Sequence, residues 1–265
     1  MNHLNAVVED FDGAVAHFRR VFGAQFVMDL PQPEWHACLI HVAGVLIELF
    51  SPAQFLLNGR YGPHYLGVEY QVDMQAARVD LAERKIRLIR DIGVAVHTHP
   101  ADTAGIAWEF YEGNFHTMPG DTWLEPLQPP DYWRDRHPLG LLGLERYSVV
   151  VADIDGMTAH LADFLGATVI YEELRPAVAR VAGLQLADTT VELLSPVGPG
   201  EIAQHLQRYG DGIRSIVFAV GDLDRARAHF RNLGIELRPG DAPATLAISP
   251  MDNAGIMMEL CARRP

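Results

Sequence analysis

Two histidines and two glutamates recur along the chain at matched positions. His3 and His64 each stand near the start of an apolar, strand-like segment, and Glu48 and Glu109 each interrupt a later apolar segment. The same spacing, 45 residues, separates His3 from Glu48 and His64 from Glu109. Two imidazoles and two carboxylates suit a divalent Zn, Ni, Co, Mn or Fe ion, and four ligands leave coordination positions open for a substrate. A single histidine in a strand is more often a core residue, but four residues at matched offsets favour a metal site.

These residues belong to a repeated unit. An apolar alternating run, an aspartate and a helical pattern follow one another in residues 3–18, 64–79, 146–161 and 215–230. The aspartates expected to cap the helices are Asp12, Asp73, Asp155 and Asp224. Each unit ends in an apolar strand with a central glutamate, which in chain order is Glu48, Glu109, Glu192 and Glu259. The repeat predicts an α+β fold of four βαβββ modules.

The modules group into two tandem halves. We place modules one and two at residues 1–115, a proline-rich linker at residues 116–142, and modules three and four at residues 143–265. In the second half, Arg146 and Ser215 occupy the positions of the histidines. Arginine does not ligate metals, although it can pair with a glutamate or bind an anion. We therefore expect the metal site in the first half and a degenerate second half.

Composition narrows the class of protein. The 265 residues carry a formal net charge of −13, which argues against nucleic acid as a partner. No apolar run reaches the roughly 18 residues that a membrane span needs, and no secretory signal is recognised at the start. Two cysteines are too few to staple a chain of this length. We expect a cytoplasmic protein that acts on a small molecule as a monomer or a homodimer.

The chain resembles the vicinal oxygen chelate superfamily, which includes glyoxalase I, methylmalonyl-CoA epimerase, extradiol dioxygenases and bleomycin-resistance proteins. The segments that carry the resemblance are HLNAVVEDFDGAVAHFRRVFGA, GPHYLGVEYQVDMQAA, GVLIELFSP and AGIAWEFYE. The resemblance implies that paired βαβββ units form an open, cup-shaped mixed sheet around one divalent metal. It implies ligands on the first and fourth strands of each unit, here His3, Glu48, His64 and Glu109.

The ligand types favour one reaction within that superfamily. Two histidines and two glutamates look most like glyoxalase I, so we expect proton transfer next to a carbonyl, by an isomerase, epimerase or lyase. Glu48 or Glu109 would be the catalytic base. One alternative is an Fe(II) ring-cleaving dioxygenase, which uses two histidines and one carboxylate, so that Glu48 counts against it. A second alternative is a resistance-type protein that binds a small molecule without turnover.

Several other polar residues fall on predicted middle strands and could line the cup. They are His36, Cys38, His41, His97 and His99. Alternation places His97 and His99 on one face of their strand, but does not say which face. In the linker, Trp123 could cover a site or simply attach the linker to the fold.

Overall fold

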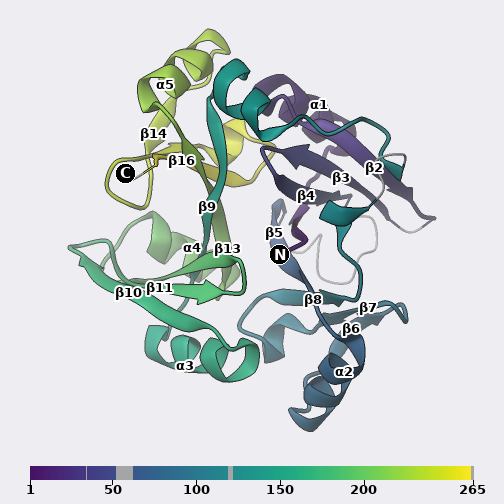
Figure 1. Ribbon diagram of the computed structural model, residues 1–265. Coiled ribbons are helices and arrows are strands. Elements are labelled where there is room, and N and C mark those ends of the chain that lie inside the picture. The colour runs from purple at the N-terminus through teal and green to yellow at the C-terminus, as the bar shows by residue number, and fades with distance from the viewer. Residues whose placement is uncertain (34, 52–61, 119–121, 264–265) are drawn as a thin grey trace.

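The computed structural model describes residues 1–33, 35–51, 62–118 and 122–263. Four modules follow one another, each with a strand, a helix and three further strands (Figure 1). Module one contains β1 (His3–Val7), α1 (Phe11–Phe22), β2 (Gln25–Pro31), β3 (His36–Val42) and β4 (Val45–Phe50). Module two contains β5 (His64–Gln71), α2 (Met74–Glu83), β6 (Leu88–Asp91), β7 (Ala95–Thr98) and β8 (Ala107–Tyr111). The prediction of an α+β fold of βαβββ modules is confirmed.

The second half of the chain repeats this order. Module three contains β9 (Leu141–Val150), α3 (Ile154–Leu165), β10 (Thr168–Arg175), β11 (Ala179–Leu186) and β12 (Thr189–Pro196). A helix, α4 (Glu201–Tyr209), follows β12. Module four contains β13 (Gly212–Val220), α5 (Leu223–Asn232), β14 (Leu237–Pro239), β15 (Thr245–Ile248) and β16 (Met257–Ala262).

The modules pair into two eight-stranded mixed sheets, one in each half of the chain. The strand order is β2-β3-β4-β1-β5-β8-β7-β6 in the first sheet and β10-β11-β12-β9-β13-β16-β15-β14 in the second. Within the first sheet, β1 runs parallel to β4, β5 runs parallel to β8, and β1 and β5 pair antiparallel. The strands that were expected to supply metal ligands are therefore neighbours at the centre of one sheet.

The helix N-caps differ from the expected ones in three of the four modules. Asp73 caps α2, as predicted, by accepting a hydrogen bond from the N–H of Ala76. In the other modules the cap is the aspartate two residues earlier, namely Asp10, Asp153 and Asp222. The first helical turn instead contains Asp12, Asp155 and Asp224, whose negative charges interact favourably with the positive end of the helix dipole. The prediction was wrong there because each helix begins one residue after the earlier aspartate.

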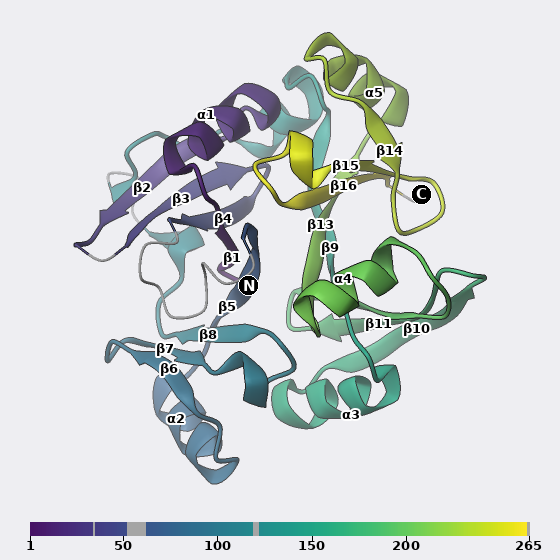
Figure 2. The same ribbon diagram turned by 180° about the vertical axis from the view of Figure 1, so that it is seen from behind.

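The two halves share one hydrophobic core. Helices α1 and α5 lie at one end of the molecule and α2 and α3 at the other, as the two opposite views show (Figures 1 and 2). The rings of Phe22 and Phe230 meet at 6.1 Å between centroids, and those of Phe110 and Phe164 also meet at 6.1 Å. The main cluster of buried apolar side chains runs through both halves. Among the described residues, no helix is long and apolar enough to cross a membrane.

Candidate metal centre

Three of the four predicted ligands lie together in the first sheet. His3 on β1, Glu48 on β4 and Glu109 on β8 are 2%, 7% and 6% exposed. The Nε2 atom of His3 lies 3.1 Å from Oε2 of Glu48 and 3.4 Å from Oε2 of Glu109. One imidazole nitrogen thus faces two carboxylates that come from different modules.

The fourth predicted ligand, His64, does not join this group. In the antiparallel pair of β1 and β5, His3 stands opposite Glu69, whereas His64 stands opposite Val7 at the other end of β1. The Nδ1–H of His64 donates to the carbonyl of Gly62 at 2.6 Å. The predicted convergence of all four residues was therefore wrong for His64.

The register of the strands explains the displacement. On β4, the residue two positions before Glu48 is Leu46, and it pairs with His3. On β8, the residue two positions before Glu109 is Ala107, and it pairs with Gly67. Gly67 is thus the counterpart of His3 in module two. A Cβ atom at Gly67 would lie 1.8 Å from the carbonyl oxygen of Ala107, so no histidine fits at that position.

Two residues that were not predicted as ligands complete the group. Nε2 of His97, on β7, lies 3.0 Å from Oε2 of Glu109, and Oε1 of Glu69, on β5, lies 3.4 Å from Nδ1 of His3. Both side chains are buried. The sequence held a signal for Glu69, which is, like Glu48, an acidic residue inside an apolar strand. His97 is brought to the group by its pairing with Glu109 in the sheet.

The side chains of this group shift one another's pKa values. Burial, together with the nearby carboxylates of Glu109 and Glu48, raises the pKa of Glu69 to about 9, although His3 opposes the shift. Burial disfavours a charged Glu109, but His97 and His3 outweigh it and hold the pKa of Glu109 well below its usual range. Burial likewise disfavours a charged His3, yet the glutamates, led by Glu69, raise its pKa well above the ordinary value. Three buried glutamates around His3 thus favour a positive charge between them.

The donor atoms fit a divalent cation. Among the described residues, both ring nitrogens of His3, Nδ1 of His97, Oε1 of Glu69 and Oδ1 of Asn5 are buried and form no hydrogen bond of normal geometry, although those of His3 lie 3.1–3.4 Å from carboxylate oxygens. Buried polar atoms are normally satisfied, so a group of unsatisfied ones indicates a site for a ligand or an ion. Ligand atoms of His3, Glu69 and Glu109 lie within 4.8 Å of one another. Imidazole nitrogen and carboxylate oxygen suit the ions named above.

The other predicted lining residues make local contacts. Nε2 of His36 lies 2.6 Å from Oδ1 of Asp29, His41 donates from Nδ1 to Oε1 of Gln25 at 3.1 Å, and Nδ1 of His99 accepts from the N–H of Ala101 at 3.1 Å. Cys38 is a buried free thiol. Trp123 packs against a buried apolar cluster of the first sheet.

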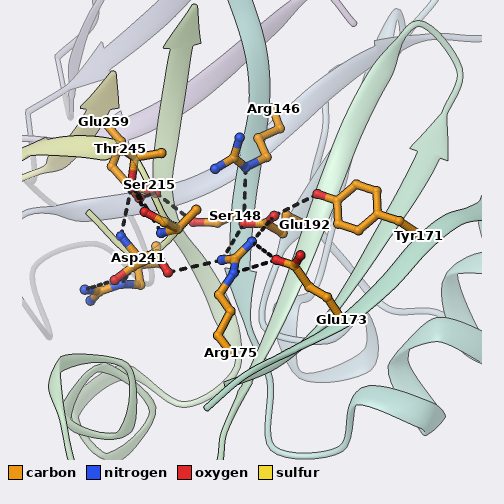
Figure 3. Close-up of polar contacts among 12 residues, drawn as sticks. Arg146, Ser148, Tyr171, Glu173, Arg175, Glu192, Ser215, Asp241, Thr245 and Glu259 are labelled. Carbon is orange, nitrogen blue, oxygen red and sulfur yellow. Dashed lines mark hydrogen bonds and ion pairs between the residues drawn. The ribbon is translucent and has the colours of Figure 1, made fainter. Parts of the chain in front are cut away.

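In the second half, internal ion pairs occupy the corresponding positions (Figure 3). Nε of Arg146 lies 3.1 Å from Oε1 of Glu192, which is the first of the two roles that the sequence left open for this arginine. Arg175 donates to both carboxylate oxygens of Glu192, at 3.1 and 2.7 Å, and the hydroxyl of Tyr171 donates to Oε2 at 2.7 Å. Guanidinium groups therefore neutralise Glu192 without an added cation.

The second glutamate of this half, Glu259, is held by neutral groups. It accepts hydrogen bonds from the hydroxyls of Ser215 at 2.8 Å and Thr245 at 3.0 Å, and from the N–H of Asp241 at 3.0 Å (Figure 3). The hydroxyls of Ser148 and Ser215 lie 2.7 Å apart, where the first half has Asn5 and Gly67. In the second sheet, the counterparts of His3, Glu48, Gly67 and Glu109 are Arg146, Glu192, Ser215 and Glu259, so none of these four positions carries a histidine.

Comparison with known proteins relates the second half of the chain to a family. Residues 143–260 match the model of the Glyoxalase/Bleomycin resistance protein/Dioxygenase superfamily. Mitochondrial methylmalonyl-CoA epimerases of Homo sapiens and Bos taurus are each 29% identical to this chain over 126 residues, covering 41% of this chain and 71% of theirs. A mutant of 4-hydroxymandelate synthase from Streptomyces coelicolor has the same fold, with a TM-score of 0.72 and 12% identity over 100% of this chain and 92% of that one. Residues 143–260 thus match the vicinal oxygen chelate superfamily.

Proposed function

We propose that the protein is a metal-dependent enzyme that transfers a proton next to a carbonyl group of a small oxygenated substrate. The observation that carries the proposal is the buried group of His3, His97, Glu48 and Glu109, in which Nε2 of His3 faces two carboxylates without a hydrogen bond of normal geometry. This group has the ligand types that the sequence suggested, two imidazoles and two carboxylates, but His97 stands in place of His64.

Each side chain has a distinct proposed role. His3 through Nε2, His97 and Glu109 would hold the divalent ion, and Glu48 stands at the same Nε2 atom as a fourth ligand. Glu69 lies at the opposite ring nitrogen of His3, where a carboxylate orients an imidazole toward a metal. The bound ion would act as a Lewis acid toward the carbonyl oxygen of the substrate.

Glu48 is the better candidate for the base. Glu109 contacts His3 and His97 and also accepts from Nδ2 of Asn5 at 3.0 Å, so three partners restrain its carboxylate. In the described part of the chain, Glu48 contacts His3 but neither Asn5 nor His97. A less restrained carboxylate can take the proton from the carbon beside the carbonyl and return it. The epimerase names of the two curated relatives agree with chemistry of this kind.

A ring-cleaving Fe(II) dioxygenase is the second candidate. His3, His97 and Glu109 by themselves form a set of two histidines and one carboxylate, which is the set that non-haem Fe(II) oxygenases use. Glu48, a second carboxylate at Nε2 of His3, favours proton transfer instead.

Metal content tests the proposal, with His64 as an internal control. We expect elemental analysis of the purified protein to find about one Zn, Ni, Co or Mn per chain. The variants His3→Ala and His97→Ala should lose it, whereas His64→Ala should keep it, because His64 lies away from the group. Iron in an oxygen-sensitive protein would favour the dioxygenase. Failure to take up any of these ions would contradict both enzymes and favour the binding protein.

A further inference from the structure

The chain that follows β8 lies over the same face of the first sheet as the proposed metal centre. Paired residues of neighbouring strands point to one face, and His3 pairs with Leu46 while Glu48 pairs with Leu39. The side chains of Leu46 and Leu39 therefore share the face that carries His3 and Glu48. Leu39, Leu46 and Val27 form a buried apolar cluster on this face. Against it pack three partly buried residues from the chain that follows β8, Phe115, Trp123 and Leu127.

Phe115 contacts a residue of the proposed metal centre. Its ring meets the imidazole of His3 edge-on, with 5.6 Å between centroids. It also stacks on the ring of Tyr111 at 5.3 Å. Tyr111 stands two residues after Glu109 on β8 and so belongs to the same face. Phe115 therefore lies over the space between the strands of His3 and Glu109.

Hydrogen bonds fix the backbone around Phe115 to the residue that precedes His3. Asn2, which is 1% exposed, donates from Nδ2 to the carbonyl of Gly113 at 3.0 Å. Its Oδ1 accepts from the N–H of Phe115 at 3.3 Å, and its carbonyl accepts from Nε2 of His116 at 2.8 Å. These hydrogen bonds thus fix the position of Phe115 relative to His3, although Phe115 follows the last strand of module two.

We propose that Phe115 is the residue that sets the size of substrate the centre accepts, an inference that rests on the proposed function. A molecule that binds through two vicinal oxygens must direct its remaining part away from the strands that hold the ligands. In that direction it meets Phe115 and the apolar side chains beside it. The substrate class that fits is a small oxygenated compound whose remaining part is apolar and compact.

Two hydroxamates that differ only in their substituent test this role. Acetohydroxamate carries a methyl group and benzohydroxamate a phenyl group, and both chelate a divalent ion through two oxygens. Their affinities for the cobalt-loaded protein can be measured from its visible absorption. In Phe115→Ala we expect the preference for the smaller compound to fall by about tenfold, because a ring-sized space opens beside His3. Phe115→Leu should give a smaller change in the same direction, and it serves if the alanine variant does not fold.

The control is Leu124→Ala, an exposed residue of the linker, which should leave the ratio of the two affinities unchanged. Cobalt bound normally, with a ratio in Phe115→Ala and Phe115→Leu that matches the parent protein, would overturn the role of Phe115 and leave the proposed function standing. If the parent protein binds neither cobalt nor zinc, nickel or manganese, the proposed function and this inference both fail.

Discussion

At the scale of single residues, burial separates the side chains that act together from those that only resemble them in spacing. His3 and His64 were equivalent in the repeat, yet His3 is 2% exposed beside three glutamates, while His64 is half-buried and bonded to a local carbonyl. The sequence did not predict a role for Glu69, which pairs in register with Glu109 in the folded sheet. An unpaired buried carboxylate costs free energy, so each one in the sheet points to a charge partner.

Glu69 gives a prediction for the metal-free protein. Its folded-state pKa of about 9 is raised from 4.5 by burial first and by Glu109 next, so folding opposes its ionisation. In the unfolded chain the carboxyl ionises above pH 4.5, and its cost to stability grows as pH rises toward 9. We expect Glu69→Gln to raise the free energy of unfolding at pH 8 by on the order of 2 kcal/mol and to have little effect at pH 5.

Urea unfolding of chelator-treated protein at the two pH values measures this difference. Glu112→Gln, at an exposed carboxyl near the end of β8, is the matched control and should change stability at neither pH. An equal gain for Glu69→Gln at pH 5 and pH 8 would show that ionisation of Glu69 does not limit the stability of the folded protein.

At the scale of elements, paired aspartates mark the start of three helices, and only one of each pair is the cap. Asp10 accepts from the N–H of Gly13 at 3.0 Å, and Asp153 accepts from the N–H of Gly156 at 3.0 Å. A Cβ atom at Gly13 would lie 2.1 Å from a carboxylate oxygen of Asp10, so a larger residue there would require the Asp10 side chain to move. In these two helices the capping aspartate stands three residues before a glycine.

The two aspartates of α1 are expected to differ on substitution. Asp10→Ala should lower the free energy of unfolding by about 1 kcal/mol, because the first turn loses the acceptor for a backbone N–H. Asp12→Ala should cost about 0.5 kcal/mol, through the helix dipole alone. Denaturant midpoints of the two variants measure the order. A larger loss for Asp12→Ala would show that the helix starts where the repeat had suggested.

At the scale of the whole molecule, the second half acts as a built-in partner of the first. Besides the contact of Phe22 with Phe230, Nε2 of His229 donates to the carbonyl of Val21 at 2.8 Å. At the other end, Arg84 pairs with Asp163 at 2.5 Å. The proposed centre thus lies in one half, while helices of the other half support the elements around it.

Phe230 tests whether the halves unfold together. It is fully buried, and Phe230→Ala should lower the free energy of unfolding by about 3–5 kcal/mol. Hydrogen exchange followed by mass spectrometry should then show faster exchange in α1 as well as in α5. Val79→Ala, at an exposed site on α2, is the control. Normal protection of α1 in the Phe230 variant would mean that the halves are energetically independent.

Patterns in the sequence were enough to predict the modular fold and three of the four proposed ligands. Alternation, helical periodicity and repeat spacing are local patterns, so they identified the βαβββ units and the acidic positions of Glu48 and Glu109. They also identified His3, which shares its strand position with Arg146 of the second half. The same comparison left two roles open for Arg146, a glutamate pair or an anion site, and the structure has the pair with Glu192.

The tertiary structure decided which other side chains meet these residues. The position of module two along β1 depends on strand register, which put Gly67 at the place expected for a second histidine and His64 at the far end of β1. The face of β7 that carries His97 depends on its pairing with β8. Phe115 reaches His3 only because the chain after β8 returns over the sheet. Register and chain return are contacts between distant segments, and local periodicity carries no information about them.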